Sequence, residues 1–191
     1  VNSAAEIKAE SDICCTSSNA IPVVRSLKEK RVIFLPDRNL ARFVQQHVPE
    51  KEIIVWPGFC ITHMRLNEEE ILRTKQRYPA ALVIAHPECE PEVLQHADCV
   101  TSTGGMFTYV RSSPAREFII ATESGMLYGL RKENPDKQFY LPSEHLICAN
   151  MKLTTLGWLL HSLENRVYPV TVDEAIRERA QQSLDRMLAI T

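Results

Sequence analysis

Short apolar runs separated by helix-like segments constrain this chain more than any other feature of its sequence. The runs are RVIFLP (31–36), EIIVWP (52–57), ALVIAHP (81–87), EFIIATE (117–123) and QFYLP (138–142). They are continuous instead of alternating and rich in β-branched or aromatic residues, which is typical of parallel strands buried on both faces. Helix-like segments lie between them, at 39–48, 67–78, 91–97 and 125–134. This order predicts an α/β fold of repeated three-layer modules with open parallel sheets.

Two further helices are predicted in the C-terminal part, at about 153–164 and 172–189. Thr171 is followed three residues later by Glu174, which is the spacing of a capping box. The last helix is therefore predicted to begin with this pair.

Composition limits the partners that the chain is expected to have. It contains 22 basic and 24 acidic residues, with a formal net charge of −2, so it offers no basic field for nucleic acid or an anionic membrane. No apolar run approaches the roughly 18 residues of a membrane span, and the N-terminus lacks the layout of a secretory signal. These features predict a cytoplasmic protein that binds neither nucleic acid nor membrane.

A repeat with a shift of 86 residues relates two parts of the sequence. It places AAEIKAESDICCTSSNA (4–20) on EPEVLQHADCVTSTGGM (90–106) and VRS (24–26) on VRS (110–112). Predicted strands fall on predicted strands, which favours a duplicated module. We therefore predict one α/β module over 1–79, a second over 80–150 and a helical segment over 151–191. The counterpart of the strand at 81–87 would lie before Val1, so the first module is expected to lack its opening strand.

Polar side chains gather where the predicted strands end. They are Ser17, Asp37, Cys60, His86, Glu88, Ser102, Thr103 and Glu123. Open parallel sheets bind ligands at this edge, where helix N-termini present their N–H groups. The hydroxyl residues are equally consistent with helix N-caps. Asp37 and Glu123, which are equivalent in the repeat, are predicted to be structural caps or ion-pairing residues.

The six cysteines are expected to be reduced, because the chain shows no secretory signal. Cys14, Cys15 and Cys99 fall within predicted strands and are predicted to pack in the core. Cys60 and Cys148 become equivalent when the repeat slips by two residues, and each follows the last strand of its module. Position therefore singles out these two cysteines.

Two metal sites are compatible with these positions. Cys60 and His63 together with His86 and Cys89 form a Cys₂His₂ set that could close a structural zinc site. Alternatively, Cys60 and Cys148 are thiolate ligands of a cluster between modules, although an ordinary iron–sulfur cluster usually takes four.

The motifs at the strand ends are similar to those of a known family. DICCTSSNA, PGFCITH, AHPEC, CVTSTGGM, IIATESG, and YLPS followed by CANMK together resemble the quinolinate synthase family of bacterial NAD biosynthesis. The resemblance extends from Asn2 to the terminal helix. It implies three similar α/β domains with pseudo-threefold symmetry, of which this chain contains the second and third. It also implies a [4Fe–4S] cluster held by one cysteine from each domain, with one iron open to substrate.

The resemblance assigns roles to residues of this chain. It implies that Cys60 and Cys148 bind the cluster, with the third cysteine on a missing upstream domain. Glu88 and His86 are then the expected catalytic residues, and the expected substrate-binding residues are Asn2, Ser17, His86, Glu88, Ser102 and Thr103. The implied reaction condenses iminoaspartate with dihydroxyacetone phosphate to quinolinate, with L-aspartate oxidase as a candidate supplier of the imine. Residues 1–191 alone are expected to be inactive.

Two other classes of protein remain compatible with the residues. A zinc-stabilised binding module would contain zinc and would not need Cys148. A metal-free α/β module that binds a small molecule would contain neither metal nor sulfide. Iron, acid-labile sulfide and zinc contents separate these two classes from the enzyme.

Overall fold

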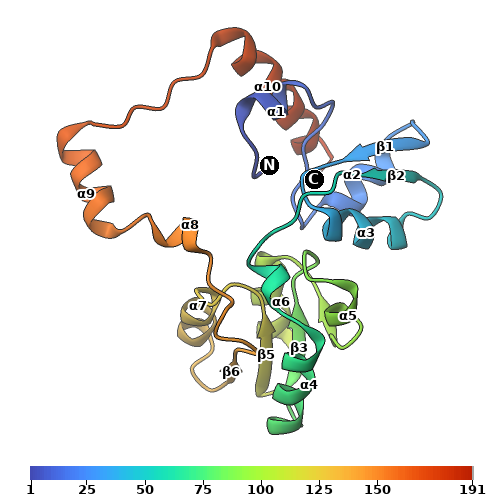
Figure 1. The fold of residues 1–191 in the computed structure, drawn as a ribbon, viewed down its shortest axis with the longest axis vertical. Coiled ribbons are helices and arrows are strands. Elements are labelled where there is room, and N and C mark those ends of the chain that lie inside the picture. The colour runs from blue at the N-terminus through green and yellow to red at the C-terminus, as the bar shows by residue number, and fades with distance from the viewer. Residues whose placement is uncertain (191) are drawn as a thin grey trace. The chain divides into compact units, whose positions relative to one another are not determined.

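Figure 1 shows the computed structural model, which describes residues 1–190. The contacts divide the chain into two compact units. One contains Val1–Thr16 and the residues from Cys148 onward, and the other contains Ser17–Ile147. This division is based on contacts between residues, whereas the predicted domain boundaries are based on the sequence repeat. The predicted modules 1–79 and 80–150 and the helical segment 151–191 therefore stay predictions.

The larger unit has the predicted alternation of strands and helices. Its elements are α2 (Ala20–Ser26), β1 (Arg31–Phe34), α3 (Arg38–His47), β2 (Glu52–Val55), the 3₁₀ helix η1 (His63–Arg65), α4 (Glu68–Arg77), β3 (Leu82–Ala85), α5 (Pro91–Leu94), β4 (Cys99–Val100), α6 (Thr103–Ser112), β5 (Glu117–Ala121), α7 (Met126–Glu133) and β6 (Gln138–Tyr140). All strand pairs are parallel, which confirms the predicted α/β class.

The second sheet has four strands in the order β4-β3-β5-β6 and helices on both faces. On one face, Ile119 and Val83 pack with Leu66, Ile71 and other buried residues before and within α4. On the other face the strand residues Ile84, Phe118, Ile120 and Phe139 pack with Met106, Val110, Leu127 and Leu130 of α6 and α7. Burial on both faces explains why these strands read as continuous apolar runs.

The first sheet consists of β1 and β2 alone. Phe34 and Ile53 are buried, as are the apolar residues of α2 and α3 that include Val23 and Val44. The opposite face differs, because Ile33 is 67% exposed and its partner Ile54 is 40% exposed. Helices thus cover both faces of the second sheet and, within residues 1–190, one face of the first.

The repeat found in the sequence extends to strand register. Arg31 pairs with Glu52 in the first sheet, and Glu117 pairs with Gln138 in the second. Each residue of the first pair lies 86 positions before its counterpart in the second. The lysines that precede β2 and β6 are also equivalent: Lys51 donates to the carbonyls of Leu27 and Glu29, and Lys137 to those of Val110 and Ser113.

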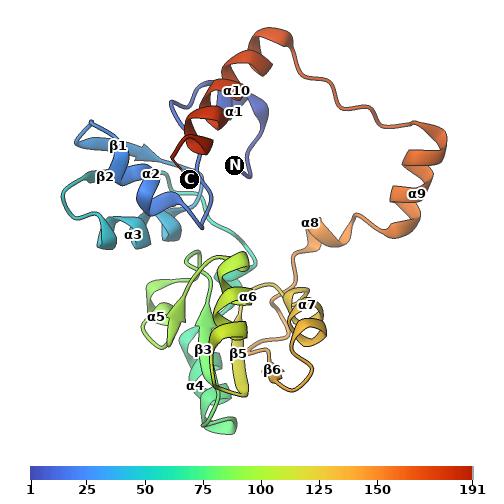
Figure 2. The same ribbon diagram turned by 180° about the vertical axis from the view of Figure 1, so that it is seen from behind.

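The smaller unit is helical. It contains α1 (Ala5–Ala9), α8 (Ala149–Lys152), α9 (Leu156–Asn165) and α10 (Glu174–Leu188). Helices α1 and α10 lie side by side in Figures 1 and 2, and Arg179 of α10 forms an ion pair with Glu10 at 2.8 Å. No helix within residues 1–190 has the length and apolar character needed to cross a bilayer.

Two local predictions are wrong. No strand forms around Cys14 and Cys15; instead the backbone N–H of Cys14 donates to the carbonyl of Ser183 in α10. The equivalent β4 forms a strand by pairing with β3, and within residues 1–190 no strand pairs with the segment around Cys14. Helix α10 is capped by Asp173, whose carboxylate accepts N–H groups of Ala175 and Ile176, and not by Thr171.

Candidate functional site

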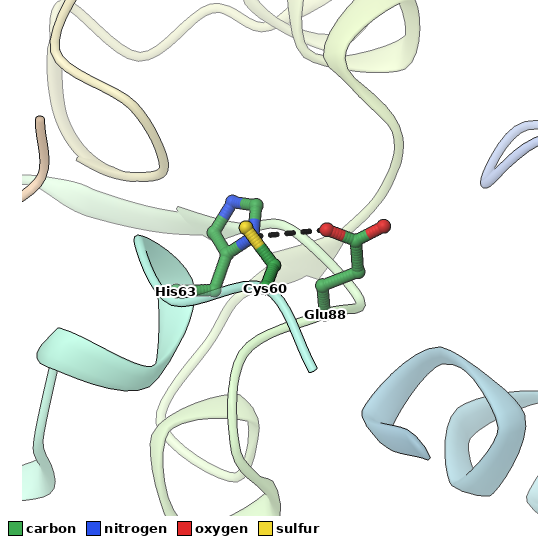
Figure 3. A group of neighbouring side chains, drawn as sticks. All are labelled: Cys60, His63 and Glu88. Carbon is green, nitrogen blue, oxygen red and sulfur yellow. Dashed lines mark hydrogen bonds and ion pairs between the residues drawn. The ribbon is translucent and has the colours of Figure 1, made fainter. Parts of the chain in front are cut away.

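Cys60, His63 and Glu88 lie together at the carboxyl ends of the strands in the larger unit (Figure 3). Cys60 lies in the loop after β2, His63 is the first residue of η1, and Glu88 follows β3. One ligand atom from each of the three side chains lies within 4.8 Å of the others. Loops from both sheets thus contribute to one group of a thiol, an imidazole and a carboxylate.

The Cys60 loop is anchored to the start of α3. Asp37 is the N-cap of α3: its Oδ1 accepts the N–H of Leu40 and its Oδ2 accepts the N–H of Cys60, both at 2.8 Å. At Gly58 the loop runs so close to β1 that a Cβ atom would lie 2.3 Å from the carbonyl oxygen of Pro36. A side chain at position 58 would therefore displace the loop that carries Cys60.

His63 is buried and both of its ring nitrogens have partners. Nδ1 lies 3.1 Å from Oε2 of Glu88, and Nε2 lies 2.9 Å from Oγ1 of Thr122. Thr122 directly follows β5 and is 1% exposed. With a polar partner on each side, the ring is fixed in orientation.

His86 stacks on His63, with ring centroids 4.6 Å apart and an angle of 6° between the planes. The backbone N–H of Glu88 donates to Nδ1 of His86 at 3.3 Å. Because Nδ1 accepts this bond, the proton of a neutral ring lies on Nε2, which faces Oγ of Ser17 at 3.2 Å. The geometry therefore favours one tautomer of His86, with Ser17 as its acceptor.

The two stacked histidines differ in protonation near neutral pH. Burial alone would lower the pKa of His63, but hydrogen bonds and charges from Cys60 and Glu88 outweigh it and raise the pKa to about 9. Burial, together with the positive charge of His63, lowers the pKa of His86 to about 4. His63 is thus a cation and His86 a neutral ring.

The groups around His63 respond to its charge. Burial opposes ionisation of Glu88 and Cys60, yet hydrogen bonds from His63 hold the pKa of each group below its ordinary value. The site therefore holds a carboxylate and a cysteine thiol of lowered pKa beside an imidazolium. Groups poised in this way can exchange protons with a bound ligand and bind a metal ion.

Other cysteines differ from Cys60. Cys89 is 0% exposed, its thiol contacts the carbonyl of Ala121, and burial raises its pKa to about 12. Burial likewise raises the pKa of Cys15 to about 11. Cys89 thus belongs to the core, and within residues 1–190 the grouped ligands are Cys60, His63 and Glu88. The Cys₂His₂ set of the zinc hypothesis, which needs Cys89 and His86, does not form.

The remaining predicted substrate-binding residues lie in two places. Ser102 is buried and is the N-cap of α6, where its Oγ accepts the N–H of Gly105, and Thr103 is exposed on the first turn. They follow β4, whose end is joined to β3 by a hydrogen bond from Thr101 N to Ala85 O. Ser102 and Thr103 thus lie at the same sheet edge as His86. Asn2 is exposed and belongs to the smaller unit.

Cys60 and Cys148 occupy equivalent places in their chain segments. The N–H of Arg38 donates to the carbonyl of Gly58, two residues before Cys60. The N–H of Ser124 donates to the carbonyl of Leu146, two residues before Cys148. Arg38 and Ser124 are 86 residues apart, so the hydrogen bonds reproduce the repeat and its two-residue slip. Cys148 is partly buried and is the N-cap residue of α8.

Sequence reasoning missed two features of the site. The sequence carries no signal for Thr122, because its contact with His63 joins residues 59 positions apart. Asp37 was predicted to be a cap, which is confirmed, but its bond to the Cys60 loop was not foreseen. The spacing Cys60-x-x-His63 was the available signal for His63.

Sequence comparisons with known proteins span all residues of the candidate site. A sequence model of the family described as quinolinate synthetase A protein matches residues 1–189. The chain is 53% identical to a quinolinate synthase of Alkaliphilus metalliredigens, 56% to one of Geotalea uraniireducens and 55% to one of Dehalococcoides mccartyi. All of this chain is aligned in each comparison, against 62–63% of the relative. The chain thus spans less than two thirds of the length of these relatives.

Proposed function

The chain belongs to the quinolinate synthetase A family, and we propose that it forms the greater part of a cytoplasmic quinolinate synthase. The proposed reaction condenses iminoaspartate with dihydroxyacetone phosphate to quinolinate, releasing phosphate and water. L-aspartate oxidase is the proposed source of the imine. The group of Cys60, His63, His86 and Glu88, formed by the loops after β2 and β3, is the structural observation that supports this proposal.

The cysteine chemistry fits an iron–sulfur cluster. Such clusters take thiolate ligands, and Cys60 combines partial exposure with a lowered pKa, whereas burial keeps Cys15 and Cys89 as thiols. We assign Cys60 and its repeat equivalent Cys148 as two ligands of a [4Fe–4S] cluster. The third cysteine is expected from a domain that residues 1–191 do not include. When bound, the cluster supplies a Lewis-acidic iron.

Glu88 and His86 have environments suited to proton transfer. The Glu88 side chain is 24% exposed, so a substrate can reach a carboxylate that lies beside the cationic His63. Imine condensation, enolisation and loss of water each need a proton moved, which a positioned acid–base pair provides. His86 is held neutral and donates toward Ser17, so its ring can bind substrate oxygens or relay a proton.

Anionic substrates need donors at the same edge. Hydroxyl groups and helix N-termini bind carboxylates and phosphates without adding fixed charge. We assign this role to Ser17, to Ser102 and Thr103 at the start of α6, and to Asn2 of the smaller unit.

Replacing Glu88 with Gln in the full-length protein tests the proposal. The change keeps the size of the side chain and removes its titration, so kcat should fall by about 10²-fold or more while the cluster still loads. Glu92→Gln, at an exposed glutamate of α5, is the matched control and should retain the wild-type rate. Wild-type turnover by Glu88→Gln would refute the acid–base assignment.

The isolated segment is a second test. Residues 1–191 expressed alone should neither retain a stable [4Fe–4S] cluster nor form quinolinate, because one expected ligand is outside them. Adding the remaining part of the protein as a co-folded fragment should restore both. Quinolinate formation by the isolated segment would contradict this.

A further inference from the structure

Cys60, His63 and Glu88 form a ligand set that differs from that of an iron–sulfur cluster. A thiolate, an imidazole and a carboxylate are three donors that Zn²⁺ binds in proteins, and thiolate does not suit Mg²⁺ or Ca²⁺. We propose that, when no cluster is bound, these three side chains bind one divalent transition-metal ion of the Zn²⁺ class.

The separations of the donor atoms fit a single ion. Zinc bonds of about 2.0–2.3 Å place neighbouring ligand atoms of a tetrahedral site about 3.3–3.8 Å apart. Here Nδ1 of His63 is 3.1 Å from Oε2 of Glu88, and the whole set of donor atoms lies within 4.8 Å. Side-chain adjustments of less than about 1.5 Å would therefore complete the contacts.

The ligands are oriented by partners outside the set. Metal-binding histidines usually donate their second ring nitrogen to a neighbouring acceptor, which fixes the ring. Nε2 of His63 lies 2.9 Å from the buried hydroxyl of Thr122, leaving Nδ1 directed at Glu88 and available to a metal. The loop of Cys60 is held in the same way by Asp37.

Charge also favours a divalent ion. On binding, one M²⁺ displaces the proton of His63 to solvent and neutralises the two negative charges of the Cys60 thiolate and the Glu88 carboxylate, with neutral His63 as the third ligand. The side chains of His63 and Glu88 are only 8% and 24% exposed, so solvent compensates these charges poorly. Three protein ligands leave a further position open, as in zinc sites that bind water or a substrate.

This ion and the proposed cluster would exclude each other, because both need Cys60. The ion requires neither Cys148 nor any residue outside this chain, whereas the proposed cluster requires both. Cys148 therefore distinguishes the two sites.

Cobalt(II) binding to cluster-free, chelator-treated full-length protein tests the proposal. We expect one Co²⁺ per chain, a thiolate-to-cobalt charge-transfer band, and loss of the band on adding Zn²⁺. X-ray absorption of the zinc form should show one sulfur and otherwise nitrogen or oxygen ligands. Absence of stoichiometric binding, or more than one sulfur ligand, would overturn the proposal.

Variants locate the ion. Cys60→Ser should abolish the band, Glu88→Gln should weaken binding at least 10-fold, and Thr122→Val should weaken it by about 10–100-fold, the usual range for loss of an outer partner. Cys148→Ser and Cys99→Ser, a matched change at a partly exposed cysteine of β4, should bind like wild type. A band that survives Cys60→Ser or disappears in Cys148→Ser would overturn the site. Since the assay uses neither cluster nor turnover, its result is independent of the proposed reaction.

Discussion

The first and second sheets share a strand register and differ in what covers them. Ile33 in β1 and Ile119 in β5 are equivalent in the repeat, yet Ile33 is 67% exposed and Ile119 is 0% exposed. Ile119 is covered by Leu66 and Ile71, which belong to the region of α4 before β3. The 86-residue shift carries α4 and β3 to positions before Val1. Pairing is thus reproduced within each repeat, whereas burial depends on elements that only the second sheet has within residues 1–190.

The largest effect is expected at the two equivalent cysteines, Cys60 and Cys148. If both repeats contribute a ligand, Cys60→Ser and Cys148→Ser in the full-length protein should each prevent normal [4Fe–4S] assembly, since three protein ligands leave none to spare. Iron and acid-labile sulfide measured after anaerobic reconstitution would show the loss. Serine at Cys14, Cys15, Cys89 or Cys99 should leave cluster content unchanged. Normal iron and sulfide content in only one of these two variants would show that Cys60 and Cys148 are not equivalent as cluster ligands.

Truncation of the equivalent isoleucines should separate the sheets by stability. Ile119→Ala removes side-chain atoms from a fully buried site and should lower the free energy of unfolding by about 2–5 kcal/mol. Ile33→Ala acts on a mostly exposed side chain and should cost less than about 1 kcal/mol. Urea denaturation followed by circular dichroism measures both. Equal losses for the two variants would contradict the predicted difference in burial.

Lowering the pH should reduce the free energy of unfolding through His86, which follows β3 of the second sheet. Its pKa is about 4 in the folded state against an ordinary value of 6.5, so the unfolded chain takes up this proton first as pH falls. The stability that His86 contributes is present above pH 6.5 and is lost between about 6.5 and 4, by at most about 3 kcal/mol. His86→Gln should reduce this loss in cluster-free protein.

Urea midpoints measured at pH 7 and pH 4.5 test the role of His86. His47→Gln, at an exposed histidine of α3, is the control in the first repeat and should keep the wild-type dependence on pH. Identical profiles for His86→Gln and wild type would exclude His86 as the source.

Replacing the equivalent lysines Lys51 and Lys137 should give the smallest difference in stability between the two repeats. Lys51→Met and Lys137→Met each remove charged hydrogen bonds to two carbonyls and should each cost about 1–2 kcal/mol. Lys137 also lies over the ring of Phe118, 5.5 Å from its centroid, so its loss should cost about 0.5–1 kcal/mol more. Comparison of the two unfolding free energies tests this order.

Local sequence predicted most elements because their apolar runs are continuous and their helices periodic. The strands at 31–36 and 117–123 were placed correctly, since each carries its own pattern. The strand expected around Cys14 was wrong, because a strand of this kind needs a distant partner that residues 1–190 do not supply. The start of α10 was misplaced for a local reason: Asp173 caps it in place of Thr171.

Within the site, spacing predicted individual residues better than their contacts. Cys60, His86 and Glu88 were identified because they follow strands that end at one edge, and the structure brings Cys60 and Glu88 together. The contact of Thr122 with His63 joins β5 to η1 and has no signal along the chain. The same limitation made Cys89 a candidate zinc ligand, although its thiol faces the core.

The close approach of Gly58 to Pro36 limits how the two repeats can exchange sequence. Duplicated coding segments can recombine, and the loops before Cys60 and Cys148 make the same backbone hydrogen bond, so they look interchangeable. Leu146, however, occupies the place that Gly58 has in the first loop, and a Cβ atom at Gly58 would lie 2.3 Å from a carbonyl oxygen. A chimaera carrying the second loop in the first repeat would have to move Cys60. The two cysteine loops are therefore not interchangeable, although they make the same backbone hydrogen bond.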